Sequence, residues 1–145
     1  MSDIGNGVAP DRIAIITADG GLRFTADIRG QRVTTDQPAS AGGDDSAAMP
    51  LELLPAALGT CIALYAHQFC AARGIPDAGL RVEVGWATAK APKRISSFDV
   101  SVTLPDEMPD EYRAALERAV RTCPVHNTLT HPPELNIELL ASVSV

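Results

Sequence analysis

The sequence of 145 residues contains three cysteines, Cys61, Cys70 and Cys123, whose thiols are its strongest candidates for covalent chemistry. In the stretch RTCPVHNTLTHPP (121–133), Cys123 stands directly before Pro124. A proline ring disfavours the α-helical conformation in the residue before it, whereas proline itself suits the first position of a helix. Cys123 is therefore predicted to be an N-cap, with its sulfur near unpaired backbone N–H groups. At the positive end of the helix dipole, this placement favours the thiolate, which is the reactive form.

The other two cysteines fall in one long apolar helix predicted over about 51–73, which Gly74 and Pro76 end. Nine residues separate Cys61 from Cys70, which is about 900° of helix rotation, so the two thiols point to opposite sides. Free cysteine is often only a small buried hydrophobic residue. That interpretation is favoured for Cys70 and stays open for the other two cysteines. One face of the helix is predicted to carry Leu54, Leu58, Cys61, Tyr65, Phe69 and Ala72.

The rest of the chain predicts strands and short helices in the order βββ-α-ββ-αα-β, an α+β fold. Runs 13–17, 22–28 and 31–35 indicate a three-stranded meander, and residues 37–49 a mobile loop rich in Gly and Asp. Two alternating runs, 80–86 and 98–104, predict a hairpin with a long charged tip, KAPKRISS.

The C-terminal part of the chain predicts two helices and a last strand. A helix opened by Pro109 must end by Cys123, and a short helix follows it. A final strand is predicted from the alternation of Leu135, Ile137, Leu139, Val143 and Val145. Residues 1–145 are expected to form a single domain, with residues 1–10 as a flexible tail.

Composition limits the possible partners and compartments. Twelve basic and eighteen acidic residues give a net charge of −6, which argues against nucleic acid or an anionic membrane as partner. The start of the chain has no basic-then-apolar signal, and the longest uncharged apolar stretch, 53–66, is too short to span a bilayer. Three cysteines without an export signal predict a cytoplasmic protein with reduced thiols.

Two motifs resemble a known family. MPLELLPAALGTC (49–61) is followed, 62 residues after its cysteine, by Cys123 of CPVHNTL (123–129), and this pair is similar to motifs of the OsmC/Ohr superfamily, the osmotically inducible and organic hydroperoxide resistance proteins. The Gly42-Gly43-Asp44-Asp45 loop before the first motif also resembles that family. The resemblance covers nearly the whole chain. It implies antiparallel sheets around a long central helix in an intertwined homodimer.

The resemblance also implies a thiol peroxidase that needs no metal or other cofactor. Cys61 would attack an organic hydroperoxide, and its sulfenic acid would condense with Cys123 to a disulfide that an external dithiol reduces. Glu52 matches the family glutamate that positions an activating arginine. Its alternative role is to favour the helix N-terminus. Arg29 and Arg32 are the nearest upstream candidates for that arginine, although neither lies in a matched motif.

Two other functions stay open. The protein could be a non-catalytic thiol redox sensor or small-molecule binder that uses the apolar pocket expected around Cys61. The Cys123-x-x-His126 spacing could also form a zinc site with Cys61, although zinc needs three or four ligands and His67 and His131 extend no such pattern. A local hydrogen bond in the first helical turn is the favoured role for His126.

Overall fold

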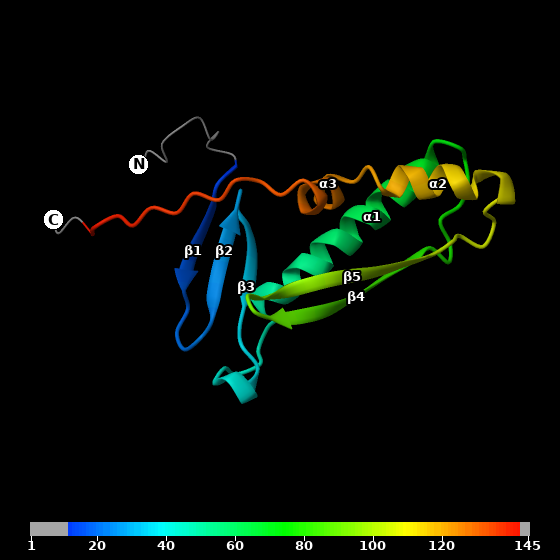
Figure 1. Ribbon diagram of the computed structural model, residues 1–145. Coiled ribbons are helices and arrows are strands. Elements are labelled where there is room, and N and C mark those ends of the chain that lie inside the picture. The colour runs from blue at the N-terminus through cyan, green and yellow to red at the C-terminus, as the bar shows by residue number, and fades with distance from the viewer. Residues whose placement is uncertain (1–11, 143–145) are drawn as a thin grey trace. The chain divides into compact units, whose positions relative to one another are not determined.

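The computed structural model describes residues 12–142 and divides into two compact units, Met1–Ala56 and Ala57–Val145 (Figure 1). In the first unit, three strands form an antiparallel sheet in the order β1-β2-β3, which confirms the predicted meander. Their bounds are Ala14–Ala18 for β1, Phe24–Ile28 for β2 and Gln31–Thr35 for β3. Residues 1–10, expected to be a flexible tail, lie outside the described residues.

The segment after β3, predicted to be a mobile loop over 37–49, is organised around the buried carboxylate of Asp36. That side chain accepts hydrogen bonds from the backbone N–H of Gln37 at 2.8 Å and from both the N–H and the hydroxyl of Ser46, at 3.0 and 2.6 Å. The Ser46 hydroxyl is the largest of the effects that lower the pKa of Asp36 to about 2. A short 3-10 helix, η2, occupies Ala39–Ala41.

Helix α1, Leu53–Ala71, follows a 3-10 turn, η3, at Pro50–Glu52. It is apolar on all sides, so its buried and exposed faces are alike in composition. The predicted buried face was partly wrong, because Leu54 is 43% exposed whereas Ile62 and Cys70 are buried. By length and composition alone, the 22 residues Pro50–Ala71 could cross a membrane, and about a third of the most apolar part of this segment is buried within the chain. A core helix of a soluble protein meets the same criterion.

In the second unit, β4 (Arg81–Lys90) and β5 (Lys93–Thr103) form a two-stranded antiparallel hairpin. The prediction of a long charged tip was wrong, because the ladder continues to the pair Lys90–Lys93 and leaves only Ala91 and Pro92 in the turn. Charged side chains at exposed strand positions do not prevent backbone pairing, and Pro92 stands where no N–H is needed.

Two helices follow the hairpin: α2 at Arg113–Val120, after a 3-10 turn η4 at Asp110–Tyr112, and α3 at Pro124–Thr130. These bounds confirm that the second helix ends before Cys123. Residues 132–142 form neither helix nor strand, so the predicted final strand is wrong in its described part; Val143 and Val145 lie outside that part. A strand needs a neighbour for its backbone groups, and β4 and β5 pair only with each other within the described chain.

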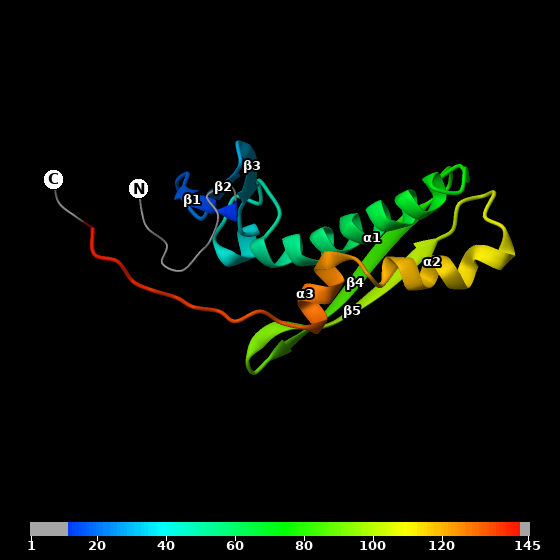
Figure 2. The ribbon, with the colours of Figure 1, turned by 90° about the horizontal axis from the view of Figure 1, so that it is seen from above.

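Helix α1 runs along the β4–β5 hairpin, with α2 and α3 beside it (Figure 2). The core between these elements forms two clusters. Toward the end of α1, Ala66, Phe69 and Cys70 pack with Leu116 of α2. Nearer its start, Leu58 and Ile62 pack with Cys123 and with apolar side chains of both strands, among them Val82, Val84, Phe98 and Val102. The second of these, the thiol cluster, contains the candidate site.

Candidate active site

The structure brings Cys61 and Cys123 together in the thiol cluster. Cys61 is half-buried on α1, and Cys123, which is fully buried at the start of α3, is one of three buried residues at the centre of the cluster. Cys70 is also fully buried but packs in the other cluster, as expected from its position nine residues along the helix. All three are free thiols. Two cysteines far apart in the sequence therefore share one apolar environment.

Cys123 is the N-cap of α3, as the Cys-Pro pair predicts. Its backbone is extended, with φ −62° and ψ 137°, and its sulfur accepts a hydrogen bond from the backbone N–H of His126 at 3.3 Å. The Cys123 carbonyl accepts the first helical hydrogen bond, from Asn127 at 3.0 Å. Pro124 occupies the first helical position, where its missing N–H costs nothing.

The sequence predicted that this cap would favour the thiolate of Cys123. That prediction was wrong, because the pKa of the thiol is raised overall. Burial raises the pKa of the Cys123 thiol above its ordinary value of 9.0, and a side-chain hydrogen bond with Cys61 and the charge of Cys61 raise it further. The backbone N–H groups of His126 and Val125 act in the opposite direction and lower the pKa, but they do not outweigh burial. The sequence indicated the cap but not the depth of burial, which depends on tertiary packing.

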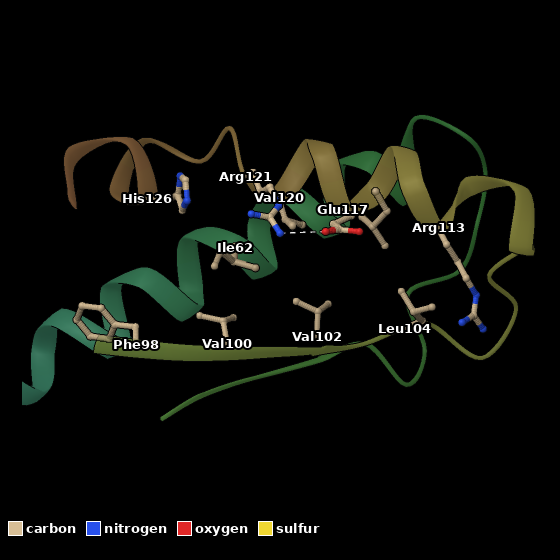
Figure 3. Close-up of a pocket in the computed structure, with 11 residues that line it drawn as sticks. Ile62, Phe98, Val100, Val102, Leu104, Arg113, Glu117, Val120, Arg121 and His126 are labelled. Atoms are coloured by element: carbon tan, nitrogen blue, oxygen red, sulfur yellow. Dashed lines mark hydrogen bonds and ion pairs between the residues drawn. The ribbon is translucent and has the colours of Figure 1, made fainter. Parts of the chain in front are cut away.

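A groove of about 630 Å³ lies beside the thiol cluster (Figure 3). The sequence predicted an apolar pocket around Cys61 but not the residues that line this groove. Its floor is one face of β5, at Phe98, Val100 and Val102, together with Leu104 just after the strand. The side chains of α1, α2 and α3 form its other walls. Neither cysteine lines it, although four apolar residues belong to both the groove and the thiol cluster: Ile62, Phe98, Val102 and Val120. The alternation along 98–104 indicated the floor, but only the fold shows which helix residues face it.

The polar groups of the groove come from α2 and α3. Arg121, the C-cap of α2, donates from Nη2 to Oε1 of Glu117 at 2.9 Å, and Arg113 lies at the start of the helix (Figure 3). Nδ1 of His126 is buried and has no hydrogen-bond partner within the described chain. The hydrogen bond predicted for this residue is therefore made by its backbone N–H, to Cys123, and not by Nδ1.

Glu52 and the two arginine candidates belong to the first unit, whereas both cysteines of the pair belong to the second. Oε2 of Glu52 accepts a hydrogen bond from the backbone N–H of Met49 at 2.9 Å, which is a capping interaction at the helix start. Arg29 lies in the turn between β2 and β3 with φ 56°, and Arg32 stands opposite Asp27 in the register of these strands; both arginines are exposed. The roles predicted for these three residues in activating Cys61 stay predictions.

The described residues offer no ligand set for the zinc site considered from the sequence. Within residues 12–142, no group of three or more His, Cys, Asp and Glu side chains is arranged to hold a metal ion. His67 instead pairs through Nδ1 with Asp77 at 2.8 Å, on the surface.

Comparison with known proteins places this arrangement in a family. The structure is similar to an osmotic stress-induced and detoxification response protein of Psychrobacter arcticus 273-4, with a TM-score of 0.73, 25% identity, and coverage of 86% of this chain and 90% of that one. An OsmC-like protein from Mycoplasma pneumoniae has a TM-score of 0.65 at 19% identity, covering 83% and 86% of the two chains. The organic hydroperoxide resistance protein OhrB of Bacillus subtilis has a TM-score of 0.51 at 21% identity, covering 83% and 92%.

No curated protein matches this chain in sequence. The sequence pattern of the OsmC-like proteins, however, matches residues 43–138, a segment that includes both cysteines of the pair, all of α1 and all of the second unit up to Glu138. This segment is well over half of the chain, and the α+β fold with antiparallel sheets and a long helix agrees with it. The chain therefore belongs to the family of OsmC-like proteins.

Proposed function

We propose that this protein is a thiol-dependent peroxidase that reduces organic hydroperoxides to alcohols through Cys61 and Cys123. The observation that carries the proposal is the packing of these two free thiols in one apolar cluster. Membership of the OsmC-like family supports it, as does the fold shared with proteins named for organic hydroperoxide resistance, such as OhrB of Bacillus subtilis.

In the proposed reaction, the Cys61 thiolate attacks the distal oxygen of the hydroperoxide, the O–O bond breaks, and the alcohol leaves after it takes a proton. Cys61 is then a sulfenic acid. The Cys123 sulfur attacks the Cys61 sulfur and displaces hydroxide, which leaves as water with the proton of the Cys123 thiol. An external dithiol reduces the resulting disulfide by two successive exchanges and returns both thiols.

The environment of each cysteine fits its proposed role. Cys61 is half-buried, which suits the residue that meets the substrate, whereas the fully buried Cys123 packs in the same cluster. The raised pKa of Cys123 keeps it a thiol at neutral pH, which supplies the proton needed to form water in the second step. The surrounding side chains, including Leu58 and Ile62, are apolar and favour an alkyl hydroperoxide over hydrogen peroxide.

Activation of Cys61 needs a positive charge or hydrogen-bond donors, because an apolar setting disfavours a thiolate. We propose that an arginine supplies the charge, with Arg29 and Arg32 as candidates and Glu52 as the residue that positions it. Replacing each arginine separately by methionine, which keeps most of the side-chain volume, tests this. The required residue is the one whose loss slows the reaction of Cys61 with peroxide while Cys70 reactivity is unchanged.

We further propose that two copies of the chain form the active assembly, a homodimer in the cytoplasm. Large apolar side chains remain exposed on the single chain: Leu64 on α1 is 50% exposed, and Leu135, Ile137 and Leu139 are 85–94% exposed. A soluble monomer rarely leaves such surfaces uncovered, and a second copy offers the same apolar surfaces in return. Light scattering on the purified protein should give twice the chain mass; a monomer at micromolar concentration contradicts this part of the proposal.

The activity is tested by following the consumption of cumene hydroperoxide and of hydrogen peroxide, each with a lipoyl dithiol or glutathione as reductant. Repeated turnover of cumene hydroperoxide with the dithiol, at a rate well above that with hydrogen peroxide, supports the proposal. One equivalent of peroxide consumed per chain, with no turnover in excess dithiol, contradicts a peroxidase and favours the redox sensor.

A further inference from the structure

The sulfur of Cys123 has two partners in the thiol form of the protein. On one side it accepts the backbone N–H groups at the start of α3, from His126 at 3.3 Å and also from Val125. On the other side it lies next to Cys61, whose side chain hydrogen-bonds with it. One sulfur atom therefore serves both as the cap of a helix and as the second thiol of the proposed reaction.

Helix α3 depends strongly on this cap. It has only seven residues, Pro124–Thr130, and a helix of this length is not stable without tertiary contacts. Its first turn contains no acidic side chain that could accept the free N–H groups instead. The side chain of Val125 packs against the thiol cluster and the ring of His126 lines the groove, so both are positioned by the same turn.

A disulfide bond between Cys61 and Cys123 affects both roles of the Cys123 sulfur, as the cap of α3 and as the second thiol. Oxidation removes one hydrogen atom from each thiol and brings the two sulfurs from hydrogen-bond distance to a bond of about 2 Å, which draws the Cys123 sulfur toward α1. The S–S bond also fixes the direction of the Cys123 side chain, so its sulfur is no longer free to follow the backbone N–H groups of His126 and Val125. The bond to Cys61 and the hydrogen bonds to the α3 backbone therefore compete.

We propose that formation of the Cys61–Cys123 disulfide uncaps α3 and releases its first turn, so that the helix reports the oxidation state of the thiol pair. This inference rests on the proposed function for its physiological oxidant, but not for the disulfide itself. When the turn opens, the ring of His126 leaves the groove wall, and residues 132–142, which follow α3 directly, gain freedom with it.

Hydrogen–deuterium exchange on the full chain tests the proposal. Diamide, an azo compound that takes up the two hydrogen atoms, forms the disulfide without any peroxidase activity, and mass spectrometry verifies that it has formed. In the oxidised protein the amides of residues 125–128 should exchange about fivefold faster than in the reduced protein, as expected for the loss of one helix cap. Amides in the middle of α1 and in β5 should not change.

Cys123→Ser is the matched control, because a serine hydroxyl caps a helix well but forms no disulfide. Its exchange over 125–128 should be slow and unaffected by diamide, and Cys70→Ser should respond like the wild type. If the disulfide forms and exchange over 125–128 stays the same, the coupling is contradicted, whatever the protein does with peroxides. If exchange over 125–128 does increase on oxidation but the protein consumes no peroxide, the proposed function fails while the uncapping of α3 by the disulfide is supported.

Discussion

The backbone N–H of His126 donates to the sulfur of Cys123 at 3.3 Å, in a position where the sulfur is fully shielded from solvent. The hydrogen bond stabilises the thiolate and the burial destabilises it. Burial has the larger effect, and the thiol pKa is raised. This balance has a measurable consequence for stability, because the unfolded chain has neither the cap nor the burial.

Stability should fall with rising pH in the range where the unfolded thiol ionises first. Below the ordinary thiol pKa of 9.0, Cys123 is protonated in both states, and its contribution to stability is fully present. As the pH rises above that value, the unfolded state releases its proton before the folded state does, so stability is lost until the folded pKa is passed. Urea unfolding between about pH 8 and pH 11 should show a steeper decline for the wild type than for Cys123→Ser. Parallel curves would contradict the raised pKa.

Turnover should depend on Cys61 and not on Cys70. Replacing Cys61 by serine removes the proposed nucleophile and should reduce hydroperoxide consumption to the uncatalysed rate, a loss of about 10³-fold or more. Cys70→Ser is the matched control on the same helix, since Cys70 packs in the other cluster. It should keep the rate constant of the wild type at a temperature where the variant is folded. An inactive but folded Cys70→Ser variant would overturn the assignment of roles.

Gly43 should not tolerate a side chain. A Cβ atom there would overlap the carbonyl of Gln37, with the carbonyl carbon at 2.6 Å and Oδ1 of Asp36 at 2.9 Å. Because Gln37 contributes backbone atoms, the loop itself must move, and Gly43→Ala should lower the free energy of unfolding by about 2–3 kcal/mol. At Gly85 the nearest atom to an added Cβ is 3.9 Å away, so Gly85→Ala is the control and should change stability far less in the same denaturation experiment.

Arg73 should stabilise the end of α1 through two aromatic rings. Its guanidinium carbon lies 3.6 Å from the ring centre of Phe69 and 5.6 Å from that of Tyr112, and Nη1 donates to the Phe69 carbonyl at 3.1 Å. Arg73→Ala should lower the free energy of unfolding by about 1–2 kcal/mol. Arg94, whose hydrogen bond goes to the carbonyl of Pro92 in the hairpin turn, provides the control, and Arg94→Ala should have an effect below about 0.5 kcal/mol. Equal effects would contradict the role of the rings.

The sequence predicts local structure well where one residue type determines the backbone. The Cys123-Pro124 pair gives the N-cap, and Gly74 marks the end of α1, because each depends on neighbours in the chain. Apart from the final strand, the order of the elements was also predicted correctly, from the apolar periodicity of each segment. Which residues of α1 are buried was only partly predicted, because a helix that is apolar on all sides has no hydrophobic periodicity that marks its buried face.

Properties that depend on distant contacts could not be predicted. The raised pKa of Cys123 comes from side chains of α1 and both strands, and the groove needs α2 and β5 to face each other. The final strand was expected from the alternation of Leu135, Ile137 and Leu139, but alternation shows only that a segment could pair. Within the described chain no strand pairs with it.

The most direct test of the central claim is the identity of the bond that forms when hydroperoxide reacts with the protein. Cys70→Ser protein is treated with one equivalent of cumene hydroperoxide, digested without reductant and analysed by mass spectrometry. The account predicts a single species in which the peptides containing Cys61 and Cys123 are joined by a disulfide within one chain. Cys61 oxidised to sulfinic acid, with Cys123 left as a free thiol, would contradict it.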